Sequence, residues 1–223
     1  MFKTRSTQPE RIDTGDYTSE EYATFLREIR FINRYLGDAR ALRRSLFREI
    51  GRLDLREFSL LDVACGSGEL LRQTVHFAKS TGRDAKLTGI DLHELSFIES
   101  ATGISFVRGD AFRLPFADDS FDFVISSLFF HHLSDEQIPL AIAEMSRVAR
   151  CGAFVIDLER SRTAYYLYKL FCFGFRVSPL VSEDGALSIR KGFRIDDLSR
   201  FGEVRRSAPF RINLSLDLKR PKS

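Results

Sequence analysis

Residues 58–69 read FSLLDVACGSGE, an apolar run interrupted by Asp62 and followed by two glycines, Gly66 and Gly68. Glycine adopts backbone conformations that other residues resist, and it lets a ligand approach the main chain closely. A helix that starts directly after such a turn also offers backbone amides that have no partner within the helix. The stretch therefore predicts a buried strand, a ligand-binding turn and a helix that begins at Glu69.

The same pattern continues downstream, where short apolar runs alternate with helical stretches. Apolar runs lie at 58–64, 86–92, 104–110, 121–130 and 152–158, and helices are expected at 68–80, 93–101 and 135–150. Continuous apolar strands separated by helices are typical of a parallel sheet covered on both faces. We expect an α/β fold with a Rossmann-like, doubly wound sheet.

The flanking regions differ from this alternation. Apolar residues at helical spacing predict two N-terminal helices within 19–50, hinged near Leu36 to Asp38, and the aromatic stretch RTAYYLYKLFCFGF predicts a helical insertion. A short helix should end at Gly202, and EVRRSAPF with RINLSLDL should close a seven-stranded sheet with an antiparallel last strand. We expect one domain over 1–223, with a helical cap at 1–57, a core at 58–160, a substrate-lid insertion at 161–192 and the final helix and strands at 193–223.

The composition indicates a soluble globular protein, because 43% of its 223 residues are hydrophobic and 29% are charged. Cys65, Cys151 and Cys172 lie far apart, which suits a reducing compartment and argues against a zinc site or a disulfide framework. We expect no metal. Because the first residues lack the apolar centre of a signal peptide, we expect a cytoplasmic protein.

The most membrane-like segment, residues 165–181, is too short to span a bilayer and contains Lys169 and Arg176. It could still rest on a lipid surface, so a peripheral membrane contact stays open. The oligomeric state is not predicted.

Residues downstream of the glycine turn narrow the choice of its ligand. A dinucleotide fingerprint needs a small third residue, and that position is Leu71. Asp91 ends the second strand, where a carboxylate accepts hydrogen bonds from ribose hydroxyls, and Asp110 ends the third, where it could accept from the amine of adenine. Ligands in open α/β sheets bind at this edge.

These motifs resemble those of the class I S-adenosylmethionine-dependent methyltransferases, most closely the small single-domain branch that includes ubiquinone and menaquinone methyltransferases. The resemblance covers about residues 58–160 and is carried by LLDVACGSGEL, GIDL, VRGDAFRLPFADDSFDFVISSLFFHHL and EMSRVARCGAFVIDL. Ala64 departs from the pattern, since many members carry a glycine there. Alanine fits if that position does not need a positive φ.

The resemblance implies S-adenosylmethionine as cofactor and assigns residues to its parts. Asp62 and the backbone of Ala64, Cys65, Gly66, Ser67 and Gly68 would hold the methionine portion; Asp91 and Leu92 the ribose; Asp110, Ala111 and Phe112 the adenine; and Ser126 and Ser127 would line the sulfonium region. Three of these have simpler interpretations: Asp91 as a solvated strand end, Asp110 as a turn former and Cys65 as a packing residue.

Methyl transfer needs a protein base only when the acceptor is protonated at neutral pH, as a phenol is. His131 and His132 lie just past the fourth strand, and imidazole suits this proton. The sequence does not choose between them, although we favour His131, and one of them could simply pack the loop. The acceptor should contact Phe130 and the aromatic insertion at Tyr165 and Tyr166, although an ordinary core helix also explains part of that stripe.

The N-terminal helices, DLERSRTAYYLYKL and GFRIDDL also resemble, more loosely, methyltransferases associated with bacterial type III polyketide synthases. This likeness implies a small hydrophobic aromatic acceptor of secondary metabolism, such as a phenol, an aromatic polyketide or a quinol, with O-methylation favoured over C-methylation.

Two other functions stay open. Residues 161–223 carry 13 basic and 6 acidic residues, a balance that would suit an RNA or protein methyltransferase. The fourth strand ends in SSLFF, however, without the Asn/Asp-Pro-Pro-Tyr type of sequence of many amino-group methylating enzymes, so nucleic acid is not the expected partner. The chain could also bind S-adenosylmethionine without catalysing a reaction.

Overall fold

A computed structural model describes residues 2–35, 38–92, 103–216 and 218. Its centre is a seven-stranded sheet in the order β3-β2-β1-β4-β5-β7-β6. The strands are β1 (Glu57–Val63), β2 (Asp84–Asp91), β3 (Ile104–Arg108), β4 (Phe121–Ser127), β5 (Ala149–Leu158), β6 (Gly202–Ser207) and β7 (Arg211–Leu216). β1 to β5 are parallel, whereas β7 runs antiparallel to both β5 and β6. The predicted Rossmann-like sheet with an antiparallel last strand is confirmed.

The stretch FSLLDV becomes the central strand because burying its apolar side chains on both faces of the sheet removes them from water. Phe58, Leu60, Leu61 and Val63 are each at most 3% exposed. β1 pairs with β2 on one side and β4 on the other, and the chain order reverses between these neighbours. A crevice forms at such a reversal, beyond the carboxyl ends of the strands. The turn after β1 therefore opens into the place where a ligand is expected.

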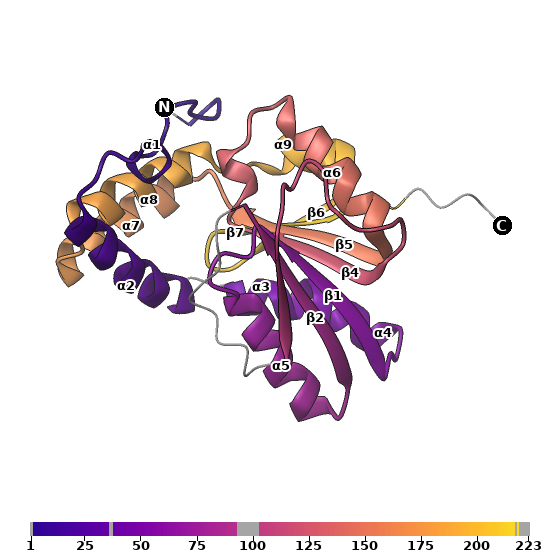
Figure 1. Cartoon of the computed structure of the whole chain (residues 1–223). Coiled ribbons are helices and arrows are strands. Elements are labelled where there is room, and N and C mark those ends of the chain that lie inside the picture. Colours follow the sequence, from indigo (N-terminus) through magenta and orange to yellow (C-terminus); the bar gives the residue numbers. More distant parts are fainter. Residues whose placement is uncertain (1, 36–37, 93–102, 217, 219–223) are drawn as a thin grey trace.

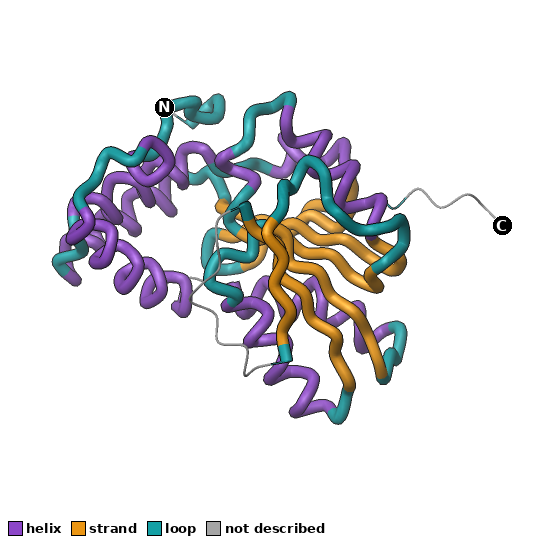
Figure 2. The backbone as a smooth tube through the Cα atoms, viewed as in Figure 1, coloured by secondary structure: helices purple, strands orange, loops and turns teal. Residues whose placement is uncertain are grey.

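Helices cover both faces of the sheet (Figure 2). On one face, α6 (Gln137–Val148) packs Met145 against Val124 and Val155 in a shared core cluster. On the other, α5 (Glu69–Thr81) and the helices from α3 (Asp38–Leu42) to α4 (Arg48–Arg52) enclose a second cluster. A π-helical turn, Arg43–Phe47, joins α3 to α4. The start of α5 at Glu69 agrees with the prediction, while the helix expected at 93–101 lies outside the described residues.

A group of helices stands beyond the carboxyl ends of the strands (Figure 1). It contains α1 (Arg11–Thr14), α2 (Ser19–Tyr35), α7 (Arg162–Phe175) and α8 (Pro179–Lys191). Ile32, Tyr168 and Val181 are buried together and join α2, α7 and α8 into one unit. The aromatic stretch RTAYYLYKLFCFGF forms α7, in agreement with the helical insertion expected there, and α8 follows within the same insertion. The predicted hinge near Leu36 lies partly outside the described residues.

The chain then returns to the sheet through α9 (Ile195–Leu198) and a 3₁₀ turn, Ser199–Phe201, and Gly202 begins β6. Among the described helices, none combines the length and the apolar character that crossing a bilayer requires.

The N-terminal segment is tied across this end of the molecule by one arginine. The Arg5 guanidinium donates to the carbonyls of Lys191 and Leu133 at 2.9 Å each and to Asp135 Oδ1 at 2.6 Å, and it lies over the ring of Phe193. Arg5 thus connects the start of the chain to α8 and to the loop after β4. The consequence is that residues 8–13 are held against the loop that carries the two histidines.

Candidate functional site

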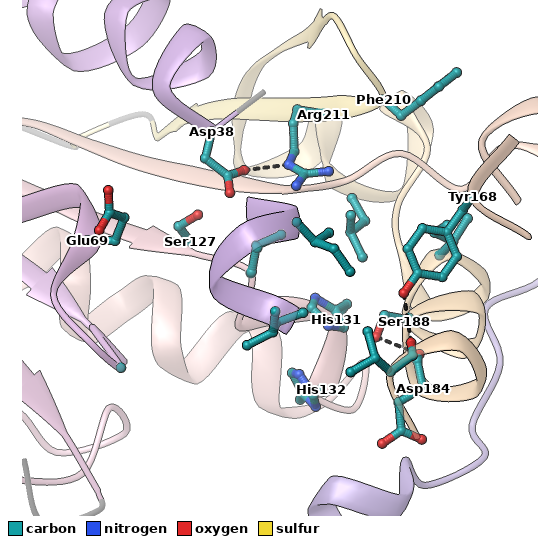
Figure 3. Close-up of a pocket in the computed structure, with 18 of the residues that line it drawn as sticks. Asp38, Glu69, Ser127, His131, His132, Tyr168, Asp184, Ser188, Phe210 and Arg211 are labelled. Carbon is teal, nitrogen blue, oxygen red and sulfur yellow. Dashed lines mark hydrogen bonds and ion pairs between the residues drawn. The ribbon is translucent and has the colours of Figure 1, made fainter. Parts of the chain in front are cut away.

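A cavity of about 610 Å³ lies between the carboxyl edge of the sheet and the helical group. Its floor comes from the β1–α5 turn and the end of β4, and its other walls come from α2, α7, α8 and the start of β7. Figure 3 shows Glu69 and Ser127 at one end and Tyr168 and Asp184 at the other, with His131 between them. One continuous space therefore joins the glycine turn to the helical insertion.

The turn after β1 is left-handed at three positions. Ala64 has φ +57°, Gly66 +49° and Gly68 +69°. The condition under which alanine fits without strain at position 64 is therefore not met, which corrects the expectation for that residue. A non-glycine residue in this region costs about 1 kcal/mol. The strain persists because hydrogen bonds hold the turn on both sides.

Those hydrogen bonds connect the turn to the end of β2. The N–H of Cys65 donates to Ile90 O at 3.1 Å, and the N–H of Gly66 donates to Asp91 Oδ2 at 2.9 Å. Asp91 therefore supports the turn as well as ending its strand. Beneath the turn lies Gly89, where an added Cβ would come within 2.7 Å of Cys65 Sγ. Burial, followed by the charges of Asp62 and Asp91, raises the pKa of Cys65, so its thiol acts in packing.

Asp62 is the buried acid of this end of the cavity. It is 2% exposed, and burial, followed by the charge of Asp91, raises its pKa to about 8. In the described part of the chain its carboxylate has no hydrogen-bond partner. A buried acid without a partner favours a ligand that brings a positive charge, because that charge restores the ionised form.

The cavity does not reach every residue predicted to bind the cofactor. Asp62, Ala64, Cys65, Gly66, Ser67 and Ser127 line it. Gly68, Asp91, Leu92, Asp110, Ala111, Phe112 and Ser126 are not among the described residues that line it. Asp110 is exposed and accepts from the N–H of Phe112 at 2.9 Å, the contact of a turn former. Ser126 is fully buried and its hydroxyl has no described partner.

His131 is held by a carboxylate that stands at the end of β5. Its Nδ1 lies 2.8 Å from Asp157 Oδ1, and both residues are almost completely buried. Complete burial would raise the pKa of Asp157, but its interaction with the His131 ring, by charge whenever that ring is protonated and by the hydrogen bond, lowers it. An ionised Asp157 accepts from Nδ1–H, which leaves Nε2 of a neutral His131 as the ring's proton acceptor. His131 lines the cavity.

His132 belongs to a different network. Its Nδ1 lies 3.0 Å from Asp13 Oδ2, and Lys191 Nζ lies 3.5 Å from the same oxygen. Burial opposes protonation of His132, but the hydrogen bond to Asp13 and the charge of Glu10 outweigh it and raise its pKa. For Asp13 burial is likewise outweighed, and His132 with Lys191 lowers the pKa to about 2. This network therefore favours the cationic form of His132. A protonated imidazole has no lone pair left to accept a proton, so His132 is the weaker candidate for a base.

Glu10, His131 and His132 each offer a possible metal-ligand atom, all within 4.8 Å of one another. Glu10 is 3% exposed, and its Oε1 lies 3.0 Å from Lys191 Nζ. The ammonium group of Lys191 thus already supplies a positive charge to this carboxylate. The expectation that the site needs no metal stays a prediction.

The end of the cavity farthest from the glycine turn is mostly apolar, and the carboxylate of Asp184 there accepts from the backbone N–H groups of Arg11 and Ile12. Its lining residues include Phe25, Ile29, Ile32, Leu167, Tyr168, Phe171 and Phe210. Tyr165 and Tyr166 come from the same helix as Tyr168 but are not among the described residues that line the cavity, and Tyr166 is 63% exposed. Phe130 is fully buried in the core beneath the sheet's edge. The aromatic insertion therefore reaches the cavity through Leu167, Tyr168 and Phe171.

Sequence reasoning missed two buried charged residues of the site. Asp157 stands near the end of an apolar strand, as Asp91 does, so its position is a signal that was available. Arg211 had no such signal: its Nε donates to Asp38 Oδ1 at 2.5 Å, and both side chains line the cavity. Figure 3 shows its guanidinium turned toward the cavity's interior.

Comparison with known proteins agrees with this architecture. Residues 60–152 match the family described as "Methyltransferase domain". A demethylmenaquinone methyltransferase of Staphylococcus aureus (strain MRSA252) is 34% identical over 116 residues, which are 49% of this chain and 46% of that protein. The match thus spans about half the length of the curated relative.

Solved structures share the fold at low sequence identity. An S-adenosylmethionine-dependent methyltransferase from Aquifex aeolicus superposes with a TM-score of 0.50 at 18% identity, covering 81% of this chain and 89% of that one. A structure from Methanococcus maripaludis, titled as a methyltransferase of the same cofactor class, gives 0.52 at 14% identity, with 88% and 93% covered. Residues 60–152 thus match a methyltransferase domain, and the solved structures show that the chain shares their Rossmann-like fold.

Proposed function

We propose that this protein is an S-adenosylmethionine-dependent methyltransferase that methylates a hydroxyl oxygen of a small, hydrophobic aromatic acceptor. One observation carries the proposal: a single cavity joins the glycine turn and Asp62, whose carboxylate has no hydrogen-bond partner among the described residues, to the His131–Asp157 pair and then to an apolar end. The cavity thus has a polar end suited to a cationic amino acid portion and an apolar end suited to an aromatic ring.

The residues present fit the cofactor. Asp62 can pair with the ammonium group of the methionine portion, and the left-handed turn at Gly66 lets that portion lie against the main chain. We assign Asp91 to the ribose and Asp110, Ala111 and Phe112 to the adenine, as the resemblance implies. We assign Ser126 and Ser127, at the end of β4, to the sulfonium region; of these residues, Ser127 lines the cavity. When bound, S-adenosylmethionine supplies an electrophilic methyl group on a positively charged sulfur.

The protein's own part is to position the acceptor, exclude water and accept one proton. Asp157 holds His131 with Nδ1 protonated, so that Nε2 can take the proton of a phenolic hydroxyl as its oxygen attacks. We assign this role to His131 rather than His132, because Asp13 favours the protonated form of His132. A base that removes a hydroxyl proton favours O-methylation over C-methylation.

The demethylmenaquinone methyltransferase relative supports a quinone-related acceptor, because its name gives such a molecule as the one methylated; the preference for oxygen rests on His131 alone. The apolar end of the cavity supports the same class.

The observations weigh against an RNA substrate. Two cations of the basic C-terminal third are paired inside the protein: Lys191 with Glu10 and Arg211 with Asp38. Those charges are not available to phosphates, which provide most of the affinity for nucleic acid.

Transfer of labelled methyl from S-adenosylmethionine to a panel of alkylated phenols, quinols and bulk RNA tests the proposal. We expect label in the organic-soluble phenolic or quinol fraction, with its loss in His131→Ala and its retention in His132→Ala. Label in RNA alone would contradict the proposed acceptor class. Equal activity of both histidine variants and the wild type would contradict the assignment of the base.

A further inference from the structure

The outward face of α7 exposes large apolar side chains. Phe173 is 83% exposed, Phe175 65%, Leu170 64% and Tyr166 63%. Tyr166, Leu170 and Phe173 recur at spacings of four and three residues, so they share one helix face. Phe31 of α2 is also 47% exposed. We use the name apolar patch for the exposed apolar side chains Tyr166, Leu167, Leu170, Phe173 and Phe175 of α7 together with Phe31. Single exposed apolar residues are ordinary, but a cluster of this size marks an interaction site.

The apolar patch is continuous with the apolar end of the cavity. The ring centroids of Phe31 and Phe175 lie 6.4 Å apart, and those of Phe175 and Phe171 lie 4.6 Å apart. Phe171 lines the cavity, whereas Phe31 and Phe175 are at the surface. Leu167 also lines the cavity and is still 49% exposed. A row of apolar side chains therefore leads from the surface into the proposed acceptor site.

Basic residues accompany this patch, and acidic ones do not. Residues 161–182 contain Arg162, Lys169 and Arg176 but no Asp or Glu. On the helix, Arg162 and Lys169 lie one turn from Tyr166 and Phe173 respectively. The neighbouring acid of α2, Glu28, accepts from the N–H and the hydroxyl of Ser178 and is thereby engaged at the start of α8. The charge of this face is complementary to anionic lipid.

We propose that the apolar patch docks on the surface of a bilayer that contains anionic phospholipid, and that a lipid-dissolved acceptor enters the cavity from there. Aromatic and leucine side chains would enter the headgroup region, while Arg162, Lys169 and Arg176 would contact lipid phosphates. A helix with these two kinds of residue lies in the plane of an interface rather than crossing it. The docking is inferred only from the exposed side chains of the apolar patch and their charged neighbours, whereas the entry of the acceptor rests on the proposed function.

Flotation with vesicles tests the docking without any need for turnover. We expect the wild-type protein to float with vesicles of phosphatidylcholine and phosphatidylglycerol. The double variant Leu170→Ser/Phe173→Ser should lower the partition coefficient at least about tenfold, because two large side chains no longer enter the interface. Leu140→Ser is the matched control, since Leu140 is 57% exposed on α6, away from the patch, and this variant should bind as the wild type does.

A second pair of substitutions, which removes two positive charges, tests the electrostatic contribution to vesicle binding. The double variant Lys169→Gln/Arg176→Gln should bind the anionic vesicles about fivefold or more weakly per charge removed, and this difference should vanish on pure phosphatidylcholine. Neither residue lines the cavity, so methyl transfer to an acceptor dispersed in detergent should stay at the wild-type rate in all these variants. Methyl transfer to an acceptor embedded in anionic vesicles should be lower in the variants that float less with those vesicles.

Three results would overturn the proposal. The first is wild-type protein that does not float with anionic vesicles. The second is equal flotation of the wild type and Leu170→Ser/Phe173→Ser. The third is a concentration-dependent dimer, measured by light scattering, that this double variant abolishes while flotation stays absent, since it would assign the patch to a second copy of the chain. Failure of methyl transfer with every acceptor would count against the proposed function but would leave the flotation result standing.

Discussion

Asp157 accepts two hydrogen bonds from a single residue, His131: one from the ring Nδ1 at 2.8 Å and one from the backbone N–H at 3.2 Å. The N–H of Leu158 adds a third contact, at 2.7 Å to Oδ1. The carboxylate therefore determines both the position of the loop after β4 and the direction of the imidazole. The proposed base is oriented by the sheet, not by the loop that carries it.

Asp157→Asn should lower turnover by about 10²-fold or more, because the amide can donate to Nδ1 and so leave the proton on Nε2. Cofactor affinity should stay unchanged. Steady-state kinetics with an accepted phenol, together with cofactor titration, measure the two effects. Asp13→Asn is the matched control, since it makes the same change beside His132 and should alter turnover only a few-fold. Equal losses in the two variants would contradict the division of roles between the histidines.

Asp62 should give cofactor binding a characteristic pH dependence. Its pKa of about 8 in the free protein means that it is mostly protonated at pH 7, and the ammonium group of the cofactor should lower this pKa. Binding at pH 7 should therefore release close to one proton, and affinity should rise up to about pH 8. Calorimetry in two buffers of different ionisation enthalpy counts that proton. In Asp62→Asn this proton release on cofactor binding should disappear. If the variant released as many protons as the wild type, another group would be the one that titrates.

Ala64→Gly should raise the free energy of unfolding by up to about 1 kcal/mol, because glycine adopts the observed φ of +57° without strain. The gain is limited by the larger conformational entropy of glycine in the unfolded chain. Denaturant titration measures it. Ala153→Gly, in buried strand β5, serves as the comparison and should be destabilising. Destabilisation of similar size by both substitutions would contradict the left-handed conformation at position 64.

Gly89→Ala should destabilise the protein by about 1–3 kcal/mol, since the new Cβ would lie 2.7 Å from Cys65 Sγ and 2.8 Å from Phe106 Cε1. It should also weaken cofactor binding, because the turn above it must shift. Removing the sulfur in Cys65→Ala/Gly89→Ala should recover part of the loss. Thermal unfolding of the two single variants and the double variant gives the coupling. If the destabilisation of the double variant equalled the sum of those of the two single variants, the clash at position 89 would not involve Cys65.

Much of the fold could be predicted because each signal in it is local. The apolar runs around Leu61 and Val124 have no alternative to burial, and Gly66 and Gly68 allow only a tight turn between strand and helix. The final antiparallel pair was also predictable from two short alternating runs separated by Pro209 and its neighbours. The apolar runs before them predicted Asp91 and Asp110 at strand ends: Asp91 is the last residue of β2, and Asp110 lies two residues past the end of β3.

The remainder of the site depends on contacts between residues that are distant in the chain. Arg211 meets Asp38 across 173 positions, and the pairing of His132 with Asp13 spans 119. No periodicity reports such contacts. The lining of the insertion was missed for a different reason. An aromatic stripe shows that a helix has an apolar face, but only packing decides that Tyr168 lies inside while Tyr166 faces solvent.

Direct titration of the protein with S-adenosylmethionine tests the central claim, that the turn at Gly66 and the acids Asp62 and Asp91 hold this cofactor. We expect saturable binding by the wild type and an affinity about 10²-fold lower in Asp91→Ala, which loses hydrogen bonds to the ribose and the support of Gly66. Asp122→Ala, which removes an acid at the opposite end of the sheet, should bind as the wild type does. Absence of binding by a folded wild-type protein would contradict the account.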